Sequence, residues 1–159
     1  MTPSYLPDSA PGPETSVRAP SPASLASARI AVLDNGKPNA GVVMARAAES
    51  LAARTGATVS LVTKKGPQGR SANAAIPMAR DVSERLLDEA DLVITGAADC
   101  GSCTAYSVQD AIELERAGVP AVVVTTTKFE PVATTLSANF GLADTRRLVL
   151  PLSLIHISE

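Results

Sequence analysis

Two cysteines, Cys100 and Cys103, are the residues of this sequence best suited to chemistry. They are the only cysteines in its 159 residues, and Gly101 and Ser102, which allow close backbone approach, separate them. At a helix N-terminus, which carries roughly half a positive charge, a Cys-x-x-Cys thiol pKa falls from about 8.5 into a range reaching about 3.5. We therefore expect a thiolate at neutral pH that attacks a small electrophilic, peroxidic or disulfide substrate.

Other interpretations of the two cysteines stay open. Asp99 adds a negative charge that opposes thiolate formation, unless it acts as a base or orients a partner. Two small apolar cysteines could also simply pack at a tight turn. The spacing suits half of a zinc site, but the sequence has no second cysteine pair, so zinc would need carboxylates or a second subunit. No cofactor is evident, because neither a GxGxxG pattern nor a P-loop is present.

The elements that must position the cysteines are short β-branched runs that alternate with helical stretches. The runs span residues 29–33, 58–63, 91–95, 119–125 and 147–150. Val43, Ala47 and Leu51 recur at helical spacing before Gly56, and further helices are expected near 78–86, 105–117 and 131–140. This alternation predicts an α/β three-layer sandwich with a mostly parallel five-stranded sheet, Rossmann-like or flavodoxin-like.

In such a sheet, ligands bind where the loops after the carboxyl ends of the strands converge. Polar residues after the first strand could bind an anionic or carbonyl group, although Asn39 is equally well explained as a helix N-cap. Thr125 is equally well explained as a β-branched strand end. The expected catalytic residues are Cys100, Cys103 and Asp99. The expected substrate-binding residues are Asp34, Asn35, Lys37, Asn39, Ser102, Thr104 and Thr125.

Composition disfavours several classes of partner. The 14 basic and 16 acidic residues form no patch, and aromatic content is 3% without tryptophan, so nucleic-acid binding is not expected. No run approaches the roughly 20 apolar residues that cross a bilayer. We expect a cytoplasmic protein whose partner is a small-molecule substrate or thiol reductant, with a homo-oligomer as a further option.

The two ends of the chain differ in character from its middle. Residues 1–28 hold six of the 12 prolines, which predicts a disordered leader before a domain over residues 29–151. Residues 152–159 resemble the translation of a sequencing-library adapter. They are therefore expected to be non-native, with the domain truncated after Pro151 and His156 without function. The alternative is an ordinary strand extension.

The cysteine motif and its surroundings resemble the UGSC family. The similar parts are D-C-G-S-C-T at 99–104, D-A-I at 110–112, G-V-P at 118–120 and the opening stretch at 32–39, so the resemblance spans nearly all of residues 29–151. Some members of that family carry selenocysteine where Cys100 stands. The resemblance therefore implies that Cys100 is the attacking atom and Cys103 its resolving partner, without implying a substrate.

The chain departs from that family after its last predicted strand. Relatives typically continue with a Pro-His-Pro-like turn, whereas Leu152 follows Pro151 here. If that histidine helps to activate the thiol, this chain lacks it. Two functional hypotheses follow: a thiol-dependent enzyme that acts on a small substrate, or a non-catalytic ligand-binding or assembly subunit that uses the same cleft.

Overall fold

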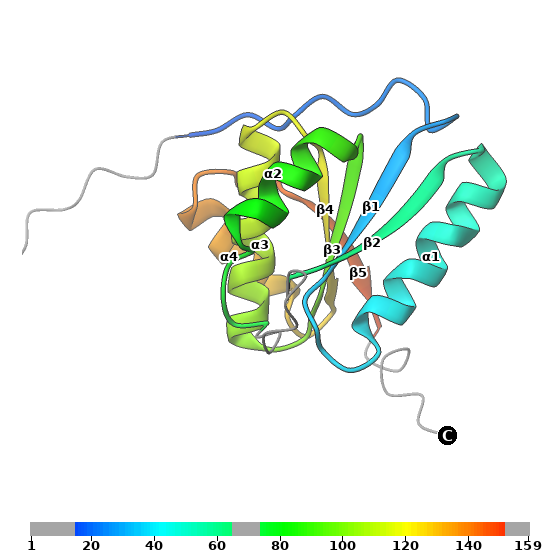
Figure 1. Cartoon of the computed structure of the whole chain (residues 1–159). Helices are drawn as coiled ribbons and strands as arrows, with labels where there is room; N and C mark the ends of the chain where they lie inside the picture. Colours follow the sequence, from blue (N-terminus) through cyan, green and yellow to red (C-terminus); the bar gives the residue numbers. More distant parts are fainter. Residues whose placement is uncertain (1–14, 65–73, 152–159) are drawn as a thin grey trace, which may run out of the picture.

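The computed structural model describes residues 15–64 and 74–151, in which strands alternate with helices (Figure 1). The elements are β1 (Arg29–Asp34), α1 (Ala40–Thr55), β2 (Thr58–Thr63), α2 (Arg80–Glu89), β3 (Leu92–Ala98), α3 (Gly101–Arg116), β4 (Ala121–Thr126), α4 (Glu130–Asn139) and β5 (Arg146–Leu150). The predicted α/β class and the order of the elements are confirmed.

All neighbouring strands of the sheet are parallel, in the order β2-β1-β3-β4-β5. This is the flavodoxin-like order, so the structure decides between the two predicted topologies. The chain leaves β1 toward one edge of the sheet and β3 toward the other. The loops after β1 and β3 therefore border the switch point, which is where ligands bind in open α/β sheets.

Helices cover the two faces of the sheet unequally. Of the helices in the described residues, α1 lies on one face, while α2, α3 and α4 cover the other (Figure 1). Met44 and Ala48 of α1 are buried against Ile30 and Val32 of β1. Helix α1 ends at Thr55 and is capped by Gly56, as the sequence predicted, and the φ of Gly56, 79°, is left-handed.

Strand β3 and helix α3 both differ from their predicted bounds near the cysteines. Strand β3 continues to Ala98, beyond the predicted end at Thr95, and α3 begins at Gly101 rather than near residue 105. The added strand residues are small and carry no β-branched signal, and the pairing with β4 shifts register between Thr95 and Ala98. Gly96 has a φ of 138°, and a Cβ there would lie 2.5 Å from the Val124 carbonyl oxygen, so the shift requires glycine.

The N-terminal segment differs from the disordered leader expected from its composition. Residues 15–28 cross the edge of the sheet where the strands begin, drawn in blue in Figure 1. The Ala19 amide donates to the buried Glu115 carboxylate at 2.7 Å, and the Ser16 amide donates to the Gly141 carbonyl at 2.7 Å. Tertiary partners thus offset the entropy of ordering this segment. The predictions for residues 1–14 and 152–159 lie outside the described residues.

No helix within the described ranges is long and apolar enough to cross a membrane.

Candidate functional site

The two cysteines lie together at the start of α3, as the sequence predicted. Cys100 is the N-cap residue, and Cys103 is in the first turn. Their sulfurs form a disulfide bond across a Cα–Cα distance of 5.4 Å. The Cys103 amide points at Cys100 Sγ, 3.3 Å away, so the backbone of the first turn already offers a hydrogen bond to that sulfur.

The two sulfur-bearing residues differ in exposure. Cys103 is fully buried, whereas Cys100 is partly exposed. Ser102 is exposed, with its hydroxyl 3.8 Å from Cys100 Sγ. The buried Thr104 donates its hydroxyl and its amide to the Cys100 carbonyl, at 2.6 and 2.9 Å, and so holds the turn from below. Cys100 is therefore the more accessible of the two cysteines, and Ser102 is a predicted binding residue whose exposed side chain lies beside it.

Asp99 and Lys37 join the loops that follow β3 and β1. Lys37 Nζ forms an ion pair with Asp99 Oδ1, and both side chains are about a quarter exposed. The same carboxylate oxygen lies 4.0 Å from Cys103 Sγ. The structure thus brings a cation and a carboxylate against the dithiol, at the edge predicted from the sequence.

Besides Thr104, two further predicted substrate-binding residues are buried beneath the site. Asn35 donates its side-chain amide to the Ala97 carbonyl at 3.1 Å. Thr125 donates its hydroxyl to the Ala98 carbonyl at 2.8 Å. Neither side chain is accessible to solvent. Both residues therefore position the backbone that leads to Asp99, rather than offering a surface to a substrate.

Asp34 and Asn39 lie at the N-terminal end of α1. A Cβ on Gly41 would lie 2.8 Å from the Asp34 carboxyl carbon, so the carboxylate packs directly on the first turn of the helix, where negative charge is favourable. It also accepts a hydrogen bond from the Gly36 amide at 2.8 Å. Asn39 occupies the N-cap position with a φ of 63°, but its exposed side chain makes no capping hydrogen bond.

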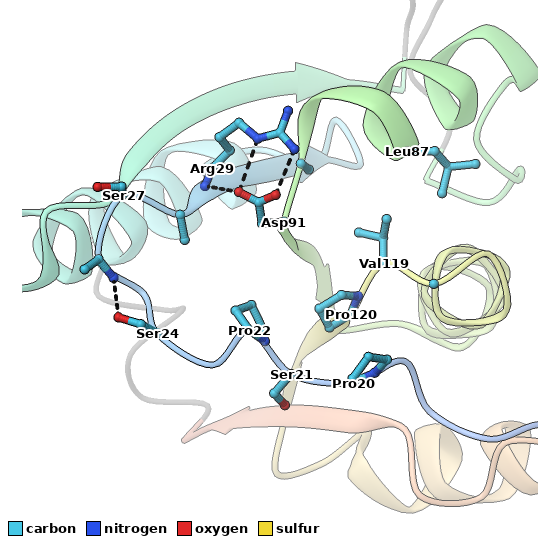
Figure 2. Close-up of a pocket in the computed structure, with 14 residues that line it drawn as sticks. Pro20, Ser21, Pro22, Ser24, Ser27, Arg29, Leu87, Asp91, Val119 and Pro120 are labelled. Carbon is cyan, nitrogen blue, oxygen red and sulfur yellow. Dashed lines mark hydrogen bonds and ion pairs between the residues drawn. The ribbon is translucent and has the colours of Figure 1, made fainter.

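Two hollows lined by described residues lie at opposite edges of the sheet. A hollow of about 40 Å³ adjoins the Lys37–Asp99 pair and also contacts Asn39, Val43 and Leu150. It has room for a group of a few atoms. A larger hollow of about 560 Å³ lies at the edge where the strands begin, under residues 20–28 (Figure 2). Its charged lining residues, Arg29 and Asp91, already pair with each other at 2.8 Å.

The structure contains a buried ion pair that the sequence patterns did not predict. Lys64, at the end of β2, pairs with Asp110 of α3, and both side chains are almost fully buried. Lys64 also donates to the Ile76 carbonyl at 2.8 Å, and Asp110 accepts from the Met78 amide at 2.9 Å. Burial raises the pKa of Asp110, against the opposing attraction of Lys64. The pair therefore connects residues 76–78, which precede α2, to α3, the helix that begins at the cysteines.

The position of Asp110 contained a signal for this ion pair. Its neighbours on α3, Val108, Ala111 and Ile112, are buried and apolar. A carboxylate among them requires a partner. Local spacing, however, does not reveal which basic residue supplies it.

Fold and site together define a flavodoxin-like α/β protein with a Cys-x-x-Cys disulfide at its switch point. The chain belongs to the UGSC family, whose family model matches residues 3–159. This confirms the resemblance drawn from the motif, and the match includes both end segments. No curated protein and no solved structure matches the chain.

Proposed function

We propose that this protein is a dithiol–disulfide oxidoreductase that acts on a small disulfide or peroxidic substrate. The observation that carries the proposal is the Cys100–Cys103 disulfide, in which the first residue is partly exposed and the second is buried. Such a pair has one sulfur available to attack and one available only to resolve. This favours the redox form of the predicted thiol chemistry over a lone nucleophile.

For a disulfide substrate, the reaction proceeds by two exchanges. The Cys100 thiolate attacks one substrate sulfur; a Cys100–substrate bond forms, the substrate S–S bond breaks, and one thiolate leaves. Cys103 then attacks Cys100 Sγ, which releases the second substrate thiolate and closes the protein disulfide. The substrate gains two electrons and the cysteine pair loses two, and a thiol reductant reverses the exchange to regenerate the dithiol.

The surroundings supply the charges that each step needs. The Cys103 amide and the N-terminal end of α3 stabilise negative charge on Cys100 Sγ. Asp99, 4.0 Å from Cys103 Sγ, is placed to accept the proton of the resolving thiol. Lys37 offsets the carboxylate charge, which would otherwise disfavour a thiolate at Cys100.

Trapping of the mixed disulfide tests this proposal. Reduced Cys103→Ser, exposed to oxidised glutathione with a metal chelator present, should keep one glutathione on Cys100, as seen by intact mass. The wild type should release the adduct and form its internal disulfide. Cys100→Ser is the matched control and should form little adduct, because Cys103 is buried. Equal adducts on both variants, or none on either, would reject the mechanism and favour a non-catalytic ligand-binding or assembly subunit.

A further inference from the structure

We infer that the reduced protein binds one Zn²⁺ ion through Asp99, Cys100 and Cys103. The sulfur atoms of the two cysteines and a carboxylate oxygen of Asp99 all lie within 4.8 Å of one another. The two cysteines have the spacing of half of a zinc site, and the structure adds the Asp99 carboxylate as a third ligand. The inference needs a disulfide that can be reduced, but not catalytic turnover.

The separation between the Asp99 carboxylate and the Cys103 sulfur already matches what zinc requires. Zn–S bonds of about 2.3 Å and Zn–O bonds of about 2.0 Å put neighbouring ligand atoms of a tetrahedral site roughly 3.5 to 4 Å apart. Asp99 Oδ1 and Cys103 Sγ already lie 4.0 Å apart. Reduction breaks the bond between the sulfurs, and the partly exposed Cys100 side chain can then rotate away from Cys103 while the backbone stays in place.

The charges around the site also suit a divalent cation. Two thiolates and one carboxylate carry three negative charges, which Zn²⁺ and the neighbouring Lys37 together balance. A carboxylate has about four acceptor positions, so Asp99 can hold the ion and Lys37 at once. Binding releases the Cys103 thiol proton, and any proton still on Cys100, to solvent, and no electron is transferred.

Three protein ligands leave the fourth position of the ion open. Catalytic zinc sites have this arrangement, with water or substrate as the fourth ligand, whereas structural sites are closed by four protein ligands. The small hollow that Lys37, Asp99 and Leu150 line adjoins Asp99, the carboxylate ligand of the inferred site. Oxidation removes both thiolates, so the site exists only in the reduced protein.

Titration of the reduced wild-type protein with Co²⁺ under anaerobic conditions, followed by competition with Zn²⁺, tests the site. We expect one ion per chain, with sulfur-to-cobalt charge transfer and tetrahedral d–d bands, and none with the oxidised protein. Cys103→Ser should weaken Zn²⁺ binding at least 100-fold, and Asp99→Asn at least tenfold. Asp144→Asn is the matched control, because it makes the same change in an exposed carboxylate that pairs with Arg18 outside the site.

Two results would overturn the inference. Reduced protein that takes up no Co²⁺ has no site, whatever the trapping of glutathione shows. Binding that Asp99→Asn leaves unchanged would mean that the ion is held by the sulfurs without the carboxylate. Because the glutathione experiment contains a chelator, a failure of the metal site and a failure of the proposed redox function are distinguishable.

Discussion

The two edges of the sheet differ in the groups that they hold and in how those groups are fixed. The edge where the strands end has the small hollow, the disulfide and the Lys37–Asp99 pair. The edge where the strands begin has the large hollow, lined mainly by prolines and small residues (Figure 2). The proposed chemistry therefore lies beside the smaller of the two hollows. The two sulfurs lie where strand ends converge on a helix N-terminus, which is the edge where open α/β sheets bind ligands.

A buried charge network fixes the edge where the strands begin. Glu115 is almost fully buried and accepts hydrogen bonds from the Ala19 and Ala121 amides, at 2.7 and 3.0 Å. It also pairs with Arg146, which donates to the Ala19 carbonyl at 2.7 Å. These contacts clamp the N-terminal segment to β4 and β5. We therefore expect substitutions there to change stability and leave thiol chemistry intact.

The largest expected effect is that of Glu115→Ala. It removes the ion-pair partner of Arg146 and leaves two backbone amides without an acceptor, and breaking a buried pair costs about 3 to 5 kcal/mol. Urea denaturation of the oxidised protein measures the loss. Glu115→Gln, which keeps an acceptor for one amide, should lose less. The folded fraction should still trap glutathione when Cys103→Ser is added, and loss of trapping in folded protein would show that the two edges are coupled.

Asn35→Ala should affect both stability and chemistry, because Asn35 lies below the cysteine loop. Removing its hydrogen bond to the Ala97 carbonyl should cost about 1 to 3 kcal/mol. It should also slow alkylation of reduced Cys100, because the loop loses a support. Thr125→Val, which removes the hydrogen bond to the Ala98 carbonyl, should do the same to a smaller extent. An unchanged alkylation rate in both variants would mean that Asn35 and Thr125 do not support the cysteine loop.

The sequence predicted the edge at which these residues gather but not the way their side chains face. The positions of Asn35 and Thr125 near strand ends predict substrate-binding residues. In the structure both side chains are buried and support the backbone instead. The end of β3 was missed because its small residues lack a β-branched signal. The packing of the N-terminal segment was missed because Ala19 finds its partner, Glu115, 96 positions later. Local patterns therefore identified the cysteine motif and the element order, but not contacts made across the fold.

Replacement of Asp110 by Asn should change how the free energy of unfolding depends on pH, and not only its value at a single pH. Its folded-state pKa is raised, mainly by burial, so the native state holds this proton more strongly than the unfolded chain does. The resulting stability is full below the ordinary carboxyl pKa of about 4 and is lost as pH rises through the raised value. The stability of the wild type relative to Asp110→Asn should therefore fall as the pH rises above about 4. A rise would mean that attraction by Lys64 outweighs burial.

The smallest expected effect is that of Lys37→Met on the rate of thiol modification. Without Lys37, the Asp99 charge is no longer offset, and a thiolate at Cys100 becomes less favourable. Alkylation of the reduced protein at pH 7 should slow about two- to fivefold, which corresponds to less than one pKa unit. Arg29→Met, at the opposite edge, should leave the rate unchanged. Faster alkylation of Lys37→Met would contradict the assigned role of the lysine.

The reduction potential of the Cys100–Cys103 pair tests the redox account most directly. Equilibration of the protein with a series of dithiol–disulfide buffers, followed by rapid alkylation and intact mass, gives the midpoint and the number of electrons. We expect a two-electron transition between about −270 and −120 mV, the range of Cys-x-x-Cys oxidoreductases, because the helix N-terminus stabilises a thiolate on Cys100. A midpoint below about −300 mV, which is typical of structural disulfides, would contradict the account.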